Sequence, residues 1–584
     1  MKKYLFCVSL FLFLFSFIYA QQRDSRVRDY LSPVRVVWQQ NGEQIQGANN
    51  LLLEGNGQTD FVNKNICRMI STEHDRPAIL LDFGKELQGG LQIVTGMCAS
   101  HKPIHVRIRF GESVSESMCE IDGINGATND HALRDFVVTL PWAGVFEVGN
   151  TGFRFVRIDL LDEFTTLHLE EVRAISVYRD LPYRGTFQCS DQLLNKIWMT
   201  GAYTVHLNMQ NYLWDGIKRD RLVWIGDMYP EVMTINTVFG YNEVVPKSLD
   251  LVRDMSALPA WMNGISAYSI WWLLIQYEWF CYQGDLSYLK EQKQYMCDLL
   301  RLLLSKIDEK GCENLNGFRF LDWPSSGNKP AVNAGLHALM VWAMQYGAKL
   351  CDILEESQLA DDCRKASDRM IAAADTVIVP FEKQNVSPDT PGMKQAAALM
   401  SLAGMIDKNQ ANDKYLAFNG AKGFSTFYGF YMLEAMAMAG NYQGAIDIIR
   451  EYWGAMIALG ATTFWEDFNI DWVPEAAPID NLVPEGKKDI HGDFGAHCYK
   501  GFRHSLCHGW ASAPTYWLSK YVLGIYPIDP GCQTVTIRPN LGDLEWAEGT
   551  FPTPYGDIKV RHERGQNGEI KSDIKVPEGI KIVR

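Results

Sequence analysis

The chain has 584 residues, of which 47% are hydrophobic and 12% aromatic, and its formal net charge is −14. This length exceeds what a single hydrophobic core supports, so several domains are expected. The hydrophobic content excludes a disordered chain. The negative charge argues against a nucleic-acid partner, which would need a basic face.

The first 20 residues have the pattern of a secretory signal peptide. Lys2 and Lys3 precede an apolar run over residues 6–18, and Tyr19-Ala20 resembles a cleavage site. The run is short for a transmembrane helix, although an uncleaved anchor is the alternative. We therefore expect an exported protein, periplasmic or extracellular, with no membrane insertion after signal cleavage.

Residues 21–183 are predicted to form an N-terminal β-sandwich domain. Strand-like runs cover residues 34–38, 78–84, 91–94, 104–110 and 153–160, and several of them alternate between apolar and polar side chains. Such alternation is typical of half-buried strands, and glycine and proline separate the runs.

Residues 184–525 are predicted to form a helical domain, with Ser190 as a plausible cap of a first helix that starts at Asp191. Helix-period segments then follow one another. They cover residues 192–203, 269–282, 286–306, 333–350, 359–374, 394–405, 425–439, 442–457 and 512–523. Twelve helices at about 28 residues each would make six hairpins, an (α/α)6 barrel. A less regular helical domain is the alternative.

Residues 526–584 return to a strand pattern. Alternating runs at 534–538, 557–562 and 570–576, with a turn at 565–568, predict a small C-terminal β-domain packed on the barrel. The fold class expected for the whole chain is therefore a six-hairpin helical barrel flanked by two β-domains.

The segment 214–227 is the most unusual stretch of the sequence. It holds the acids Asp215, Asp220 and Asp227, three basic residues and two tryptophans. A core segment would not carry so many charges unless they were paired, and a surface loop would rarely contain two tryptophans. We interpret it as the lining of a pocket, with Trp224 stacking on a sugar-like ligand and Arg219 holding carboxylates in place. A salt-bridged turn between two helices is the alternative.

Two further loops place acids beside aromatic rings. One contains Asp322-Trp323, and the other contains Trp465-Glu466. Carboxyl groups in such surroundings can have a raised pKa, as a general acid requires, and two acid clusters far apart in sequence fit a glycoside hydrolase. The alternative for Asp322 is a helix cap beside a core tryptophan, and Trp465-Glu466 could equally belong to a core.

Four histidines cluster near the end of the helical region: His491, His497, His504 and His508. The spacing of His504 and His508 could present two metal ligands on one face of a helix, but no acid lies at a diagnostic spacing between them. We therefore expect no metal and no other cofactor.

Motifs in the same order along most of the chain resemble the α-L-rhamnosidases of glycoside hydrolase family 78. They are the sandwich motifs 81–86 and 152–158, the start of the barrel at 185–198, the loop 460–466, and the closing motifs 537–541 and 552–556. The resemblance implies an exo-acting, inverting hydrolase of glycans. It also implies an oligosaccharide or polysaccharide as the partner and leaves the oligomeric state open.

Carried over residue by residue, the resemblance implies site roles. Asp220 falls at the general acid and Glu466 at the general base, while Asp215, Arg219, Trp224, Asp227 and His508 match binding positions. We expect Asp215 and Asp227 to bind ring hydroxyls, and Trp224, Trp323 and Trp465 to pack on the apolar face of the sugar. The two catalytic carboxyls of an inverting enzyme should lie about 6.5–9.5 Å apart.

The sequence also departs from the family pattern. Gly216-Ile217-Lys218 stands where the family usually has Cys-Pro-Gln, and Asp220 stands where it often has Glu. The linker from Asp467 to His508 is long and acidic, and it is either a substrate-shaping insert or a solvated loop. These departures leave two other hypotheses: another (α/α)6 glycosidase or a polysaccharide lyase that uses Tyr203 or His206, and a glycan-binding protein with a decayed site.

Overall fold

The structure is a computed structural model that describes residues 24–97, 102–121 and 126–583. The predicted signal peptide, residues 1–20, lies outside the described residues. Among the helices of the described ranges, none combines the length and the apolar character that crossing a membrane requires.

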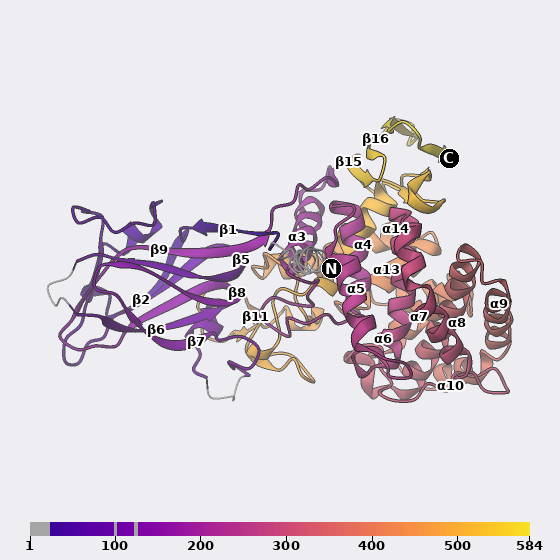
Figure 1. The fold of residues 1–584 in the computed structure, drawn as a ribbon, viewed down its shortest axis with the longest axis horizontal. Helices are drawn as coiled ribbons and strands as arrows, with labels where there is room; N and C mark the ends of the chain where they lie inside the picture. The colour runs from indigo at the N-terminus through magenta and orange to yellow at the C-terminus, as the bar shows by residue number, and fades with distance from the viewer. Residues whose placement is uncertain (1–23, 98–101, 122–125, 584) are drawn as a thin grey trace, which may run out of the picture.

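The N-terminal region is a β-structure at one end of the molecule (Figure 1). Its nine strands form one hydrogen-bonded sheet with the central order β3-β4-β9-β5-β8-β6-β7, while β1 pairs with β9 and β2 with β5. The bounds are β1 Arg26–Leu31, β2 Arg35–Gln40, β3 Ile45–Gln46, β4 Cys67–Ile70, β5 Ala78–Thr95, β6 Ile104–Gly111, β7 Asp135–Leu140, β8 Gly144–Leu160 and β9 Thr166–Arg179. The short helix α2 (Val114–Met118) follows β6.

Strands β5 and β8 are long because each belongs to two sets of paired strands. The first part of β5, residues 78–82, pairs with β2, and its later part, residues 89–95, pairs with β9. Between them the register with β8 shifts from Asp82 to Leu87. Apolar side chains from both sets form one cluster, so the sheet turns over a shared core as a sandwich does.

The helical domain follows, with long antiparallel helices on the side away from the N-terminal sheet (Figure 1). The helices are α3 Gln192–Asn208, α4 Met228–Val238, α5 Val244–Met255, α6 Ser266–Gln283, α7 Leu286–Leu304, α8 Lys329–Ile353, α9 Ser357–Ala372, α10 Asp375–Glu382, α11 Met393–Leu402, α12 Lys408–Ala411, α13 Gly429–Met438, α14 Tyr442–Ile448, α15 Gly454–Ala458 and α16 Ala513–Trp517. Helices α6 and α8 are apolar over most of their length, as expected for helices buried on most sides.

The first helix of this domain begins one residue later than predicted. Asp191, not Ser190, is the cap of α3, because its side chain accepts hydrogen bonds from the backbone N–H groups of Leu193 and Leu194. Ser190 instead accepts a hydrogen bond from the backbone N–H of Glu545. The residue before the helix therefore ties it to the C-terminal region.

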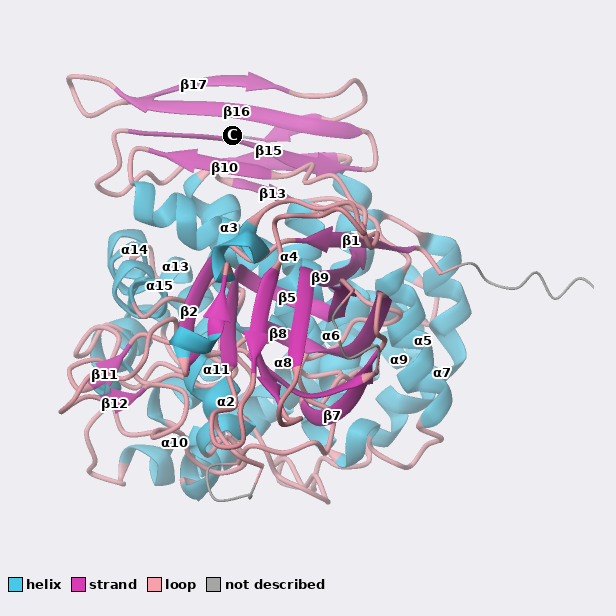
Figure 2. Cartoon of the chain, turned by 90° about the vertical axis from the view of Figure 1, so that its left-hand side faces the viewer, coloured by secondary structure: helices cyan, strands magenta, loops and turns pink. Residues whose placement is uncertain are grey.

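The C-terminal region forms two small sheets beside the helices, seen as the upper layer in Figure 2. One sheet has the order β10-β15-β16-β17, and the other has the order β13-β14-β18. The bounds are β10 Thr186–Cys189, β13 Ile525–Pro527, β14 Thr534–Ile537, β15 Trp546–Thr553, β16 Gly556–Arg564, β17 Ile570–Lys575 and β18 Lys581–Val583. Strand β10 precedes the helices in the chain, so this sheet is closed by residues from both ends of the helical domain.

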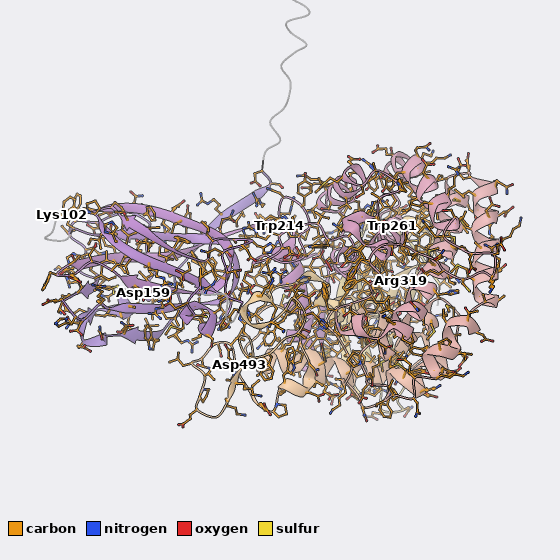
Figure 3. The ribbon with its side chains drawn as sticks, turned by 90° about the horizontal axis from the view of Figure 1, so that it is seen from below. Lys102, Asp159, Trp214, Trp261, Arg319 and Asp493 are labelled. Carbon is orange, nitrogen blue, oxygen red and sulfur yellow. The ribbon has the colours of Figure 1, made fainter. Side chains whose placement is uncertain are left out.

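The segment between α15 and α16 is largely irregular and lies between the N-terminal sheet and the helices. Its only paired strands in the described chain are the two-residue β11 (Ala476–Ala477) and β12 (Lys488–Asp489). Figure 3 places Asp493 of this segment and Trp214 of the turn after α3 between the same two regions. The predicted order of a β-region, a helical domain and a small β-region is confirmed.

Many tryptophans belong to the core. Seven of them are among the fully buried side chains, including Trp198, Trp453 and Trp517, whose indole N–H groups donate to partners inside the helical domain. Apart from Cys119, the cysteines of the described chain are free thiols. The abundance of tryptophan is therefore explained in part by packing.

Candidate active site

Three segments that are far apart in sequence meet where the helical domain faces the N-terminal sheet. The turn after α3 pairs with the segment before α16 through a bridge between Gly216 and His508. The backbone N–H of Glu466 donates to Ser505 at 2.9 Å, which joins the loop after α15 to the same segment. A side chain at position 216 would lie 2.5 Å from the Arg219 carbonyl oxygen, so this turn requires glycine.

Asp215 holds the turn that carries Asp220. Its carboxyl oxygens accept hydrogen bonds from the backbone N–H groups of Asp220 at 2.9 Å and of Leu222 at 3.0 Å. Burial, together with the charge of Asp220, raises the pKa of Asp215 to about 7. Asp215 therefore positions the turn, in addition to facing the cavity.

Asp220 is the more accessible of the two predicted catalytic carboxyls, with a side chain that is 18% exposed. One oxygen accepts from the Arg219 guanidinium at 2.8 Å, and the other accepts from the Trp224 indole N–H at 3.1 Å. His131, from the loop before β7, has its Nε2 atom 3.3 Å from the first oxygen. A side chain of the N-terminal region thus contacts a carboxyl group of the candidate site.

Glu466 is buried, with a side chain that is 6% exposed. One oxygen accepts from the backbone N–H of Ser505 at 2.7 Å and lies 3.9 Å from Arg219 Nη1, and the other lies 3.7 Å from His508 Nε2. Burial raises the pKa of Glu466 to about 8, although Arg219 and the Ser505 N–H act in the opposite direction. Arg219 thus contacts Asp220 with one end of its guanidinium and faces Glu466 with the other.

These groups surround a cavity of about 160 Å³. Eight of the ten predicted site residues line it: Asp215, Arg219, Asp220, Trp224, Asp227, Trp323, Glu466 and His508. Asp227 has one carboxyl oxygen without a hydrogen-bond partner, and burial raises its pKa well above the ordinary value. As a lining residue of the cavity, Asp227 has a carboxyl group that a hydroxyl group of a ligand can reach.

The structure does not bring Asp322 and Trp465 into this lining. Asp322 is 1% exposed and accepts from the backbone N–H of Ser325 and from Gln395 and Ser425, so it ties loops together behind the cavity. Trp465 is 1% exposed and packs edge-on against Phe468. Both side chains therefore lie in the core, as the alternative interpretation of these two loops predicts.

Phe320 also lines the cavity, and it lies in the loop of Asp322-Trp323 that the sequence predicts to line a pocket. The sequence did not predict the other lining residues, which are Ile265, Tyr268, Cys498, Tyr499 and Trp510. Cys498 and Tyr499 lie in the long linker. Trp510 lies two residues after His508, and its proximity to that motif is the one feature of the sequence that could have predicted its place in the lining. Tyr203 and His206, suggested for lyase chemistry, do not line the cavity; Tyr203 donates to the Glu86 carbonyl, and His206 contacts the Arg179 carbonyl.

Lys218, the third residue of the sequence departure, is buried behind the site. Its ammonium lies 3.0 Å from Glu112 and 3.3 Å from Glu116, both from the N-terminal region, and donates to the carbonyl oxygens of Phe502 and His504. Glu112 also accepts from the backbone N–H of Leu506 and the hydroxyl of Ser505. The lysine therefore joins the two regions next to the predicted catalytic carboxyls.

The same cluster is the one group in the described chain with the spacing of metal ligands. Atoms of Glu112, Glu116 and His491 lie within 4.8 Å of one another. The Lys218 ammonium contacts both glutamates and lies 3.5 Å from His491 Nε2, so it supplies the positive charge there. His504 and His508 are not on one helix, because the segment between them is extended and only short 3-10 turns flank it.

Comparison with known proteins agrees with this architecture. Residues 182–522 match the bacterial α-L-rhamnosidase six-hairpin glycosidase domain, and residues 524–583 match the bacterial α-L-rhamnosidase C-terminal domain. An α-L-rhamnosidase of Alteromonas sp. (strain LOR) is 23% identical over 524 residues, which cover 83% of this chain and 53% of that protein. The chain thus spans about half the length of this relative.

Solved structures share the fold. A family 78 rhamnosidase of Bacillus sp. GL1 superposes with a TM-score of 0.73 at 24% identity, covering 91% of this chain and 55% of the other. A rhamnosidase of Klebsiella oxytoca, solved with rhamnose bound, gives a TM-score of 0.66 at 20% identity, covering 85% and 96%. The predicted six-hairpin barrel is confirmed, and the chain belongs to the bacterial α-L-rhamnosidase family of six-hairpin glycosidase domains.

Proposed function

We propose that this protein is an exo-acting, inverting glycoside hydrolase that releases terminal α-L-rhamnose, or a closely related sugar, from plant or microbial glycans. The observation that carries the proposal is the placement of Asp220 and Glu466, from segments more than 200 residues apart, on the wall of one cavity of about 160 Å³. A cavity of this size takes a single sugar ring and not a glycan chain, as an exo-acting enzyme requires.

The arrangement of the two carboxyls around Arg219 is compatible with inversion. Both face the same guanidinium, Asp220 at 2.8 Å and Glu466 at 3.9 Å, which limits how far apart they can lie. An inverting site needs carboxyls about 6.5–9.5 Å apart, which leaves space for a water molecule beside the sugar. One guanidinium between two carboxyls is compatible with that spacing.

The proposed reaction uses the two carboxyls on opposite faces of the sugar. Asp220, protonated, donates its proton to the glycosidic oxygen as the bond from that oxygen to C1 breaks. Glu466, ionised, accepts a proton from the water that attacks C1 from the other face. Trp224 and Trp323 pack on the apolar face of the ring, and the Asp227 carboxyl binds a hydroxyl.

The reverse assignment of roles is a second candidate, and a specific observation favours it. Burial raises the pKa of Glu466 to about 8, which suits a proton donor at neutral pH. Asp220, by contrast, accepts hydrogen bonds with both of its oxygens, from a guanidinium and from an indole N–H. Family resemblance and the burial of Glu466 therefore point to different assignments.

An experiment with leaving groups separates the two assignments. The rates of Asp220→Asn and Glu466→Gln should be measured on a rhamnosyl disaccharide and on dinitrophenyl α-L-rhamnoside, with the product anomer followed by NMR. A leaving group of low pKa needs no proton donor, so the variant that lacks the acid retains activity on it. We expect Asp220→Asn to retain that activity and Glu466→Gln to lose at least about 10²-fold on both substrates.

The opposite pattern would assign the acid to Glu466, and retention of the anomeric configuration would exclude inversion. Failure of the unmodified enzyme on every α-L-rhamnoside, with sugar binding intact, would instead support a decayed, glycan-binding site. We further propose export to the periplasm or the extracellular space from the pattern of residues 1–20. Sequencing the N-terminus of the mature protein tests this, with cleavage expected after Ala20.

A further inference from the structure

A second hollow adjoins the proposed catalytic cavity. Its volume is about 470 Å³, and Trp323 and Tyr499 line both spaces. The long linker contributes one side of it, through residues that include Asp471, Trp472 and His497. The loops that precede α11 and α13 contribute the other side, through Asp389 and Lys422 among others. The departure of the linker from the family pattern thus falls on a wall of this hollow.

The aromatic side chains of the hollow are arranged as a platform. Trp472 stacks on Phe494 with ring centres 5.3 Å apart and an angle of 23° between the rings. It also meets Phe468 edge-on. Trp472 and Trp323 are both half-buried, so each keeps part of its ring surface in contact with the hollow. Fixed aromatic rings with an open face suit the apolar face of a sugar.

The charges of the hollow exclude an anionic ligand. Three aspartates line it, Asp389, Asp467 and Asp471, against a single lysine, Lys422. That lysine is already paired with Asp471 at 2.9 Å. A uronate entering here would therefore meet carboxylates and no unpaired lysine or arginine among the lining residues. Hydroxyl groups, in contrast, can donate to these carboxyls.

We propose that this hollow binds a second, neutral glycosyl unit of the glycan whose rhamnose occupies the catalytic cavity. The proposal rests on the proposed function, because it takes the adjoining cavity as the rhamnose site. It assigns the linker between Asp467 and His508 a role in selecting the substrate. The neighbouring unit is the leaving group, because the terminal rhamnose released by an exo-acting enzyme carries no further sugar.

The test compares substrates that differ only in the second unit. KM and kcat should be measured for nitrophenyl α-L-rhamnoside, for rhamnose linked to a neutral hexose, and for rhamnose linked to a uronic acid. Trp472→Ala should raise KM for the neutral disaccharide about tenfold more than it raises KM for the nitrophenyl glycoside.

Trp546→Ala is the matched control, since this half-buried tryptophan lies in the C-terminal sheet, where it contacts Arg561. Trp546→Ala should change KM by the same factor for all substrates. Equal effects of Trp472→Ala on all substrates, or a preference of the unmodified enzyme for the uronate, would overturn the proposal. If nitrophenyl α-L-rhamnoside is not cleaved at all, the proposed function fails. In that case, calorimetric titration of the neutral disaccharide measures its affinity for the unmodified protein and for Trp472→Ala. Weaker binding to Trp472→Ala would support this site, and equal binding would overturn it.

Discussion

At the scale of single residues, the proposed role of Glu466 as general base predicts how activity depends on pH. Burial raises the pKa of Glu466 to about 8, and a general base must be ionised. The value of kcat/KM reports the free enzyme, so it should fall as the pH is lowered through about 8. A decline of about tenfold per pH unit below that value is expected on a rhamnosyl disaccharide, measured between pH 5 and pH 9.

The control for this prediction is Glu466→Gln, which should abolish the acidic limb along with most of the activity. A profile that is flat at low pH and falls above about 8 would contradict the base assignment. It would show that Glu466 acts in its protonated form, as a general acid does.

The sequence predicted that most residues of the candidate site lie close together, but not which other residues hold them in place. Asp220, Glu466 and His508 could be placed together because each lies in a recognisable motif. Asp322 could not be separated from them by sequence, since an acid beside a tryptophan occurs in a core and in a site alike. Cys498 and Tyr499 lie in an irregular segment without periodicity, so nothing in the sequence directs them toward the cavity.

At the scale of elements, Lys218 connects helix α2 to the catalytic turn. It is buried, and its partners Glu112 and Glu116 are fully enclosed residues of the N-terminal region. Glu112 in turn accepts from Ser505 and Leu506, and the Ser505 N–H donates to Glu466. The sequence shows Lys218 only as one charge in a charged motif, because its partners lie about 100 residues earlier in another region.

We expect Lys218→Met to destabilise the protein strongly, because it leaves Glu112 and Glu116 buried without a positive partner. Removal of one side of such a pair costs about 3–5 kcal/mol, which should appear as a lower denaturant midpoint at pH 7. The variant should also lower kcat on nitrophenyl α-L-rhamnoside, since the turn that carries Arg219 and Asp220 loses an anchor.

The paired variant Lys218→Met with Glu116→Gln should recover part of this stability, because one unpaired charge is removed. Arg253→Met is a surface control, since Arg253 pairs with Asp250 and Asp254 on α5, and such pairs contribute about 0–1 kcal/mol. Equal effects of Lys218→Met and Arg253→Met would contradict the role assigned to Lys218.

At the scale of the whole molecule, the sequence indicated three regions but not how they interlock. Strand β10 precedes α3 in the chain and pairs with β15, which follows the last helix. Asp82 and Arg154 of the N-terminal sheet form a buried ion pair, and Arg154 also donates to the Gly460 carbonyl at the start of the catalytic loop. Long-range pairings of this kind leave no periodic signal in a single sequence.

The buried carboxyls of the site should also make the whole protein less stable as the pH rises. Burial raises the pKa of Asp215 and Asp467 to about 7 and of Glu466 to about 8, from 3.8 and 4.5. The folded state therefore binds these protons more tightly than the unfolded chain. The stability they contribute is fully present below the ordinary values and is lost as the pH rises through about 7 to 8. Asp24, whose pKa the hydrogen bond from Arg26 lowers to about 2, stays ionised from pH 5 upward.

The melting temperature of the unmodified protein is therefore expected to fall between pH 5 and pH 8, by on the order of 5 °C in calorimetry. Asp467→Asn removes one of these titrations, so the variant should melt higher than the unmodified protein at pH 8 and close to it at pH 5. Glu309→Gln alters an exposed carboxyl and should melt like the unmodified protein at both values. A melting temperature that rises from pH 5 to pH 8 would mean that these carboxyls are ionised in the folded protein. The assignment of Glu466 as a base with a pKa near 8 would then have to be abandoned together with this prediction.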